Sequence, residues 1–260
     1  MNPAGALALK LVLTPVLVGA ASLAGRRWGS AVGGWLIGIP FTSAPIAFFL
    51  TIDPGPAFAA KASAGIMTGA ISQAAFCLGY AWSSRACGWA PALVAGAACY
   101  AASTAVLAYL VLGLGASFVL VMVVLVVALF VMPHASPPTA AAVAAFPRWD
   151  LVARMVVATA FVVTLTELAP LLGARVAGLL APFPIYGAVL ASFARRVEGA
   201  DAAIQAVRGL VLGLFAFTCF FAVLSILLER DVALAFVAAT GATTVVHGAA
   251  LVTGRRLGLA

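Results

Sequence analysis

Long apolar runs separated by short polar turns make up almost the whole chain of 260 residues. The runs cover residues 5–24, 31–52, 58–82, 90–112, 115–132, 151–169, 176–194, 202–228 and 232–252. Each run is close to the ~20 residues that a helix needs to cross a bilayer. Their apolar positions are continuous and do not alternate as in the strands of a membrane barrel. The pattern predicts an all-α polytopic integral membrane protein with about nine transmembrane helices.

The pattern is also repeated within the chain. Residues 29–76 align without gaps with residues 173–220, at an offset of 144, and 14 of the 48 aligned positions are identical, among them Pro40 and Pro184. Five predicted helices separate the start of one copy from the start of the next. Because each crossing takes the chain to the other side of the bilayer, an odd number of crossings gives the second copy the opposite orientation. The sequence therefore predicts two inverted-topology repeats. They cover residues 5–132, with five helices, and 151–253, with four, and a Pro-rich loop at 133–150 joins them.

Composition supports the same class of protein. Apolar residues make up 65% of the chain and charged residues only 8%, whereas a soluble domain has about 25% charged residues. The net charge of +7 comes from basic residues that lie mostly in loops, which favours a role in topology and contact with anionic lipid over nucleic-acid binding. The arginine-rich loops are expected in the cytoplasm, with the N-terminus outside and the C-terminus inside. Abundant Ala, Val, Leu and Arg with little Lys suggests the inner membrane of a high-GC bacterium.

Prolines interrupt two of the predicted helices at matching places. Proline removes a backbone donor, and in a membrane the freed carbonyls need hydroxyls, water or neighbouring helices. In secondary transporters, interrupted helices of inverted halves meet near the midplane and bind substrate there. The alternative is that the prolines only kink two helices for packing. The candidate substrate-binding residues are Pro40, Thr42, Ser43, Pro45, Pro182, Pro184 and Tyr186.

Two of the predicted helices carry glycines at a spacing of four, which lets helix backbones approach closely. We expect a packing role for them. The glycines are Gly65 and Gly69 in the first repeat and Gly209 and Gly213 in the second.

Four ionisable residues fall within or near predicted helices. Lys10 and Arg154 align at the same offset of 144. The favoured interpretation is that each side chain extends to the nearby membrane interface. The alternative is that the two cations lie at the two mouths of a pathway for an anion. Glu167 lies close to the outer end of its helix, where water can solvate it. His247 lies deeper, where it either relays protons or bonds a neighbouring helix.

Motifs for catalysis are absent from the sequence. There is no P-loop, GxSxG, HExxH or paired-carboxylate motif, only two histidines, and four cysteines without a CxxC spacing. We therefore expect no catalytic residues, no metal, no cofactor and no enzymatic activity. Polar residues within the helices are expected to join helices to one another; these are Ser72, Gln73, Tyr100, Ser103, Thr104 and Thr218.

The run AGLLAPFPIYGAVLASF at 177–193, followed by a helix with spaced glycines, resembles the GlpM family of small bacterial inner-membrane proteins. The resemblance covers about residues 176–225, with a weaker echo at 32–81. Family members are about half as long as this chain, so the resemblance implies a fused pair of such units. In the echo, Ile39-Pro40 replaces Phe-Pro and Gly38 replaces the first proline. The resemblance implies ancestry and location in the inner membrane more than a particular activity.

Together these patterns favour a small secondary transporter or permease with its site between the two interrupted helices. The alternative is a non-transporting membrane subunit or regulator of envelope polymer or lipid assembly, since ion-coupled transporters usually place a carboxylate near their site. The expected partners are the lipid bilayer, a small-molecule substrate, and a second copy of the chain or another membrane protein. Nucleic acid is not expected.

Overall fold

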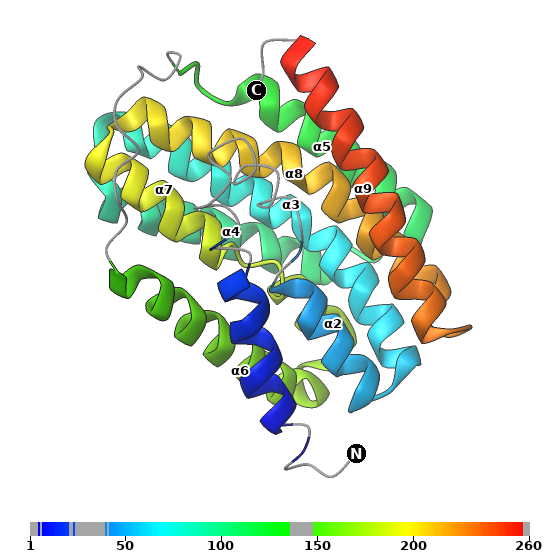
Figure 1. Ribbon diagram of the computed structural model, residues 1–260. Helices are drawn as coiled ribbons and strands as arrows, with labels where there is room; N and C mark the ends of the chain where they lie inside the picture. The colour runs from blue at the N-terminus through cyan, green and yellow to red at the C-terminus, as the bar shows by residue number, and fades with distance from the viewer. Residues whose placement is uncertain are drawn as a thin grey trace.

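The computed structural model describes residues 7–20, 42–135 and 148–256 and the single positions 5, 23 and 40; for 148–150, 153, 154, 247 and 250–256 it describes the backbone alone. Within this part of the chain all regular structure is helical (Figure 1). A first helix, Leu7–Ala20, is followed by α2 (Ser43–Ile52), α3 (Pro56–Ala86), α4 (Trp89–Tyr109), α5 (Leu114–Val131), α6 (Arg148–Leu180), α7 (Ile185–Val197), α8 (Ala200–Leu227) and α9 (Val232–Arg256).

Five of these helices are long and apolar enough to cross a membrane. They are α3, α4, α5, the part of α6 from Met155 to Leu180, and α8. The prediction of an all-α protein is therefore confirmed for the described residues, and five of its helices have the length and apolar character that a membrane crossing needs. The predicted helix at 31–52 is described only from Ser43 onward, and most of the predicted Pro-rich loop at 133–150 lies outside the described residues.

Helix α6 differs from the predicted boundaries. The sequence predicts a loop between helices ending at residue 169 and beginning at 176. The structure confirms an interruption here but reduces it to one residue. The helix continues through Pro170 to Leu172, Gly173 has non-helical torsion angles, and a second helical segment runs to Leu180. Gly173 has a φ of 77° and a ψ of 156°, a conformation open to glycine because it has no Cβ. A single residue thus turns the chain back toward the core without a loop.

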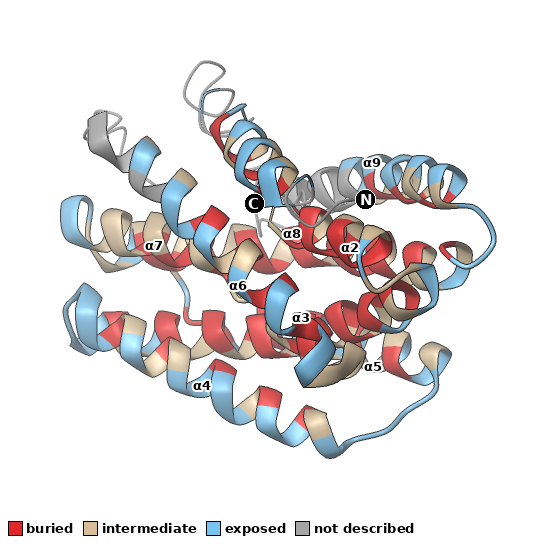
Figure 2. Cartoon of the chain, turned by 90° about the horizontal axis from the view of Figure 1, so that it is seen from below, coloured by how far each residue is buried: buried red, intermediate tan, exposed pale blue. Residues whose placement is uncertain are grey.

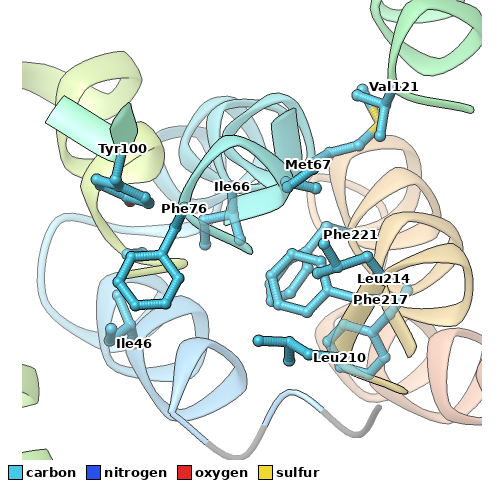
Figure 3. Close-up of a cluster of buried hydrophobic side chains, with 14 of the residues drawn as sticks. Ile46, Ile66, Met67, Phe76, Tyr100, Val121, Leu210, Leu214, Phe217 and Phe221 are labelled. Carbon is cyan, nitrogen blue, oxygen red and sulfur yellow. The ribbon is translucent and has the colours of Figure 1, made fainter. Parts of the chain in front are cut away.

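Helix α3 lies at the centre of the bundle. It packs against α2, α4, α5, α6 and α8. In its most apolar 18-residue stretch 67% of the residues are buried, whereas the figure for the corresponding stretches of α4 and α5 is 28%. Figure 2 shows the burial along α3, and exposed residues along the outward side of α4. Figure 3 draws part of the core, with Ile66, Met67 and Phe76 of α3 and Phe217 and Phe221 of α8.

The outer surface of the bundle is apolar. Large side chains that stand more than half exposed include Val106, Tyr109, Phe130, Leu171 and Val237. A soluble protein rarely exposes apolar residues as a continuous surface, whereas lipid tails solvate such a surface. These outward faces therefore suit a bilayer.

The turns before α3 and before α8 have the same geometry. Gly55 and Gly199 precede these helices and lie 144 positions apart (199 − 55 = 144). Their φ angles are 105° and 103°. The Gly55 N–H donates to Leu50 O at 3.1 Å, and the Gly199 N–H donates to Ala194 O at 3.0 Å. The helices that follow, α3 and α8, run in opposite directions (Figure 1).

Candidate functional site

The segment just before α2, where the sequence predicts that the helix at 31–52 is interrupted, is described at Pro40 and Thr42. Pro40 is not helical, Thr42 is in a turn, and α2 begins at Ser43. Pro45 is the third residue of α2, a position whose N–H has no partner within the helix, so the missing donor costs little there. The carbonyl of Pro40 accepts a hydrogen bond from the Ala44 N–H at 2.8 Å. We call residues 40–42 the first break.

The second helix break separates α6 from α7. Helix α6 ends at Leu180 and α7 begins at Ile185. Within residues 181–184, which we call the second break, Pro182 and Pro184 have no N–H to continue the helix. The Pro184 carbonyl accepts a hydrogen bond from the Ala188 N–H at 2.7 Å, as the Pro40 carbonyl does from Ala44. The two prolines thus account for the second break, and Pro40 lies at the equivalent position before α2.

The two breaks contact each other in the interior. The hydroxyl of Ser43 donates to the carbonyl oxygen of Ala181 at 3.1 Å, across 138 positions of sequence. Ser43 is 2% exposed, and Pro40, Pro182 and Pro184 are also buried. A carbonyl that the second break removes from helical bonding is therefore satisfied by a side chain at the first break.

Helix α4 supplies a second hydroxyl to the same segment. The Tyr100 hydroxyl lies 2.8 Å from the carbonyl oxygen of Leu179 and 3.2 Å from that of Leu180, and it donates to them. Of these two carbonyls, that of Leu180 also accepts from the Phe183 N–H at 3.1 Å, which leaves the Leu179 carbonyl without a helical partner. Sequence reasoning gave Tyr100 only a general helix-joining role; the signal that could have singled it out is that a buried tyrosine hydroxyl needs a partner.

We expect Tyr100→Phe to destabilise the protein by about 1 kcal/mol, because it leaves the buried carbonyl of Leu179 without its donor. In a chain of this size the melting temperature should fall by about 2–4 °C, as measured by thermal unfolding in mild detergent. The matched control is Tyr109→Phe in the same helix, where Tyr109 is 88% exposed and no change is expected. Equal effects of the two variants would contradict this role for Tyr100.

Glycines let α3 approach the second break and the end of α6 closely. A Cβ at Gly69 would lie 2.5 Å from Pro182 Cγ, and one at Gly178 would lie 2.3 Å from the carbonyl oxygen of Ala62. Gly65 faces Gly178 in the same contact. Both glycines of the first pair thus lie against residues 175–182. In the second pair, a Cβ at Gly209 would meet no atom within 4 Å, and Gly213 is buried in α8.

An aromatic cluster surrounds the second break. The ring of Phe183 contacts that of Tyr100 at 5.1 Å between centroids, that of Phe76 at 6.2 Å and that of Phe161 at 6.4 Å. The first two pairs are edge-to-face, the arrangement that aromatic rings prefer. Helices α3, α4 and α6 therefore hold the second break from three sides.

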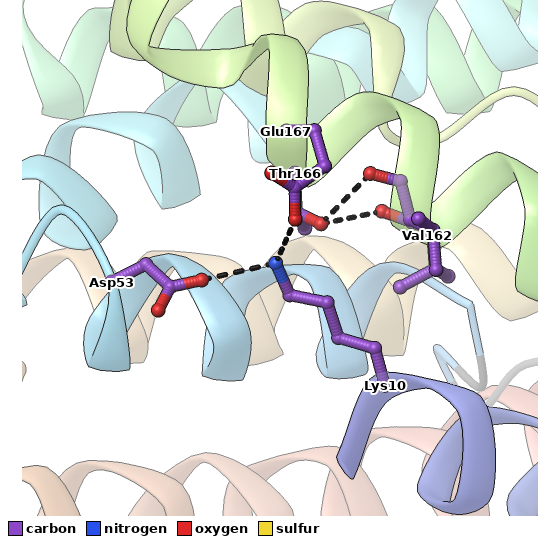
Figure 4. A network of polar contacts seen from close by, with 6 residues as sticks. Lys10, Asp53, Val162, Thr166 and Glu167 are labelled. Atoms are coloured by element: carbon purple, nitrogen blue, oxygen red, sulfur yellow. Dashed lines mark hydrogen bonds and ion pairs between the residues drawn. The ribbon is translucent and has the colours of Figure 1, made fainter. Parts of the chain in front are cut away.

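A separate polar cluster lies at the far end of α2 (Figure 4). The Lys10 ammonium is 3.0 Å from Asp53 Oδ2 and 2.9 Å from Glu167 Oε1, and it lies 5.8 Å from the centre of the Phe49 ring. Lys10 is 1% exposed, Asp53 38% and Glu167 61%. Ten helical residues separate this cluster from the first break, a length of about 15 Å. We call it the Lys10 cluster.

The Lys10 cluster was not expected from the sequence, which favoured extension of Lys10 to the membrane interface. The side chain is buried instead, and its ammonium pairs with partly exposed carboxylates from the α2–α3 turn and from α6. Glu167, expected to be solvated, is both exposed and paired. The side chains of Arg154 and His247, the other two ionisable candidates, lie outside the described residues.

Three arginines bond the carbonyls at helix ends, a role that sequence reasoning missed. Arg175 donates to the end of α4, Arg195 to the end of α3, and Arg208 to the end of α5. Cations near a helix C-terminus satisfy free carbonyls and complement the helix dipole. The acceptors are the carbonyls of Leu107 and Leu110, of Ser84 and Cys87, and of Met132 and Pro133, respectively.

The remaining candidates lie near the breaks with partial exposure. Thr42 and Tyr186 are both half-buried, next to the N-terminal ends of α2 and α7. Within the described part of the chain, no group of three His, Cys, Asp or Glu side chains could hold a metal ion. The breaks thus bring together hydroxyls, carbonyl oxygens, aromatic rings and the N-terminal ends of two half-helices.

Comparison of the chain with protein-family models, with curated proteins and with solved structures finds no match. The resemblance to the GlpM family therefore stays a prediction.

Proposed function

We propose that this protein is a small secondary transporter or permease whose substrate binds where the two helix breaks meet. The observation that carries the proposal is the hydrogen bond from Ser43 to the Ala181 carbonyl, which joins the first break to the second inside the bundle. Interrupted membrane helices are tolerated where their free backbone groups line a cavity or are met by neighbouring groups. In transporters the N-terminal ends of such half-helices point at the substrate.

Inverted repeats of five and four helices are part of this proposal. The equivalent turns at Gly55 and Gly199, the equivalent hydrogen bonds at Pro40 and Pro184, and the opposite directions of α3 and α8 all support it. Each pair of residues lies 144 positions apart, as in the sequence alignment. A two-fold axis in the membrane plane would relate the two breaks and place both near the midplane.

The proposed location is the inner membrane of a bacterium, with nine crossings, the N-terminus outside and the C-terminus in the cytoplasm. The arginine-rich loops that follow the odd-numbered helices support this orientation. The resemblance of residues 176–225 to the GlpM family supports the same membrane.

Cysteine labelling tests the proposal. Each of Thr42 and Tyr186 would be replaced by cysteine in a chain whose four native cysteines have been removed, and a membrane-impermeant thiol reagent applied from each side. We expect both positions to react, because a transport path admits water to the breaks. Single-cysteine controls are the exposed native Cys87 and Arg230→Cys, at opposite ends of the bundle. Reaction of the controls alone would refute the proposal and leave the breaks as packing features.

The alternative is a non-transporting membrane subunit or regulator of envelope polymer or lipid assembly. An ion-coupled transporter usually has a carboxylate near its site. Among the described residues the ion pairs belong to the Lys10 cluster instead, at the other end of α2 from the first break, and this favours the alternative. Purification in mild detergent separates the two proposals, because a subunit would carry a stoichiometric partner protein and a transporter would not need one.

A further inference from the structure

Gln73 lies at the middle of α3 with an unsatisfied polar atom. It is 7% exposed, and its amide oxygen Oε1 is buried without a hydrogen-bond partner. A serine or threonine hydroxyl in a helix can turn to the carbonyl one turn back. An amide oxygen only accepts, so it needs a donor from elsewhere. An acceptor left unsatisfied in the interior is unfavourable and calls for an explanation.

The neighbouring residue on α3, Ser72, has its hydrogen bonds satisfied by α4. Ser72 accepts a hydrogen bond from Thr104 of α4 at 2.9 Å and donates to Ser103 at 3.3 Å. The polar contacts between α3 and α4 are thus complete without Gln73. Its amide therefore has no part in joining those two helices.

The position of Gln73 on α3 directs it toward the second break. Residues at spacings of three, four and seven lie on one face of a helix, so Gln73 shares a face with Gly69 and Phe76. Gly69 packs against Pro182, and the Phe76 ring packs against the ring of Phe183. Gln73 therefore lies on the face of α3 that carries both contacts with residues 182 and 183.

From this placement we infer that Gln73 is a substrate-binding residue, whose amide oxygen accepts a hydrogen bond from a hydroxyl or N–H group of a small polar solute held at the second break. The inference rests on the proposed transport function. The N-terminal end of a helix carries a partial positive charge, and α7, of 13 residues, begins here. We therefore expect the solute to be uncharged or anionic.

The first test compares stability. Gln73→Leu keeps a similar volume and removes the unsatisfied acceptor, so the melting temperature in detergent should rise by about 2–4 °C. The matched control is Gln205→Leu in α8, because Gln205 does have an interaction in the structure; no rise is expected for it. A fall for Gln73→Leu would mean a structural glutamine in the core and would overturn the inference.

The second test measures access and charge preference at the same position. Gln73→Cys, in the chain without native cysteines, would be treated with the anionic reagent sulfonatoethyl methanethiosulfonate and with the cationic trimethylammonium analogue. After correction for their rates with a free thiol, we expect the anionic reagent to react several-fold faster, because the α7 N-terminus favours negative charge. The native Cys77, about one turn further along α3 and fully buried, would be retained as the single cysteine of an unreactive control.

The outcomes separate this inference from the proposed function. An inert Gln73→Cys variant beside reactive Thr42→Cys and Tyr186→Cys variants would overturn the inference and leave transport standing. Inert variants at all three positions would refute both. Faster reaction with the cationic reagent would overturn the assigned class of solute.

Discussion

Gly178→Ala is expected to destabilise the protein by about 3 kcal/mol, as overpacking of a tight contact does. A Cβ at this position would lie 2.3 Å from the Ala62 carbonyl oxygen, 2.9 Å from Gly65 Cα and 3.0 Å from Ile66 N. All three are backbone atoms of α3, which cannot turn aside as the end of a side chain can. Accommodating one methyl group therefore requires α3 and α6 to separate along their whole contact.

Thermal unfolding in mild detergent measures this effect, and Gly209→Ala is the matched control. A Cβ at Gly209, also within a helix, meets no atom within 4 Å, and replacing a helical glycine by alanine stabilises by roughly 0.5–1 kcal/mol. The two variants should thus move the melting temperature in opposite directions. Similar melting temperatures would show that α3 and α6 are not in close contact.

The second large effect is expected for Lys10→Met, which keeps the length of the side chain and removes the ammonium. Asp53 and Glu167 would then be two like charges without the cation between them. Losing one partner of a buried ion pair is strongly destabilising, but these carboxylates are 38% and 61% exposed, so water recovers part of the loss. We expect a destabilisation of about 2 kcal/mol.

Two comparisons identify the cause of this loss. Lys61→Met, at an exposed lysine of α3, should change stability by less than about 0.5 kcal/mol. Combining Lys10→Met with Asp53→Asn and Glu167→Gln should restore part of the lost stability, because the uncompensated negative charges are removed as well. If the triple variant is no more stable than Lys10→Met alone, the loss comes from packing and not from charge.

The sequence predicted the helices well wherever an apolar run has a polar turn at each end. The helix predicted at 58–82 is α3 at Pro56–Ala86, and the one predicted at 115–132 is α5 at Leu114–Val131. The second break was predicted because two prolines within three residues remove two donors. The interruption at Gly173 lies within the loop predicted at 170–175, but the sequence did not show that a single residue is enough to make it.

The hydrogen-bond and ion-pair partners of the polar side chains could not be predicted from the sequence, for a different reason. Lys10 and Glu167 lie 157 positions apart, and no local pattern connects them. The same holds for Tyr100 and Leu179, which are 79 positions apart. Each residue type was recognised as polar within an apolar helix, but its partner depends on how helices from both halves of the chain pack.

The central position of α3 also bears on the order in which the molecule is assembled during synthesis. Helix α3 ends at residue 86 and α8 at residue 227, so 141 residues are made between them (227 − 86 = 141). At about 5–20 residues per second, the ribosome needs roughly 7–28 s for that distance. Throughout this interval the face of α3 that later buries against α8 has no protein partner. The partners of Gly65 and Gly69, residues 175–182, are made earlier, because Pro182 follows the end of α3 by 96 residues (182 − 86 = 96).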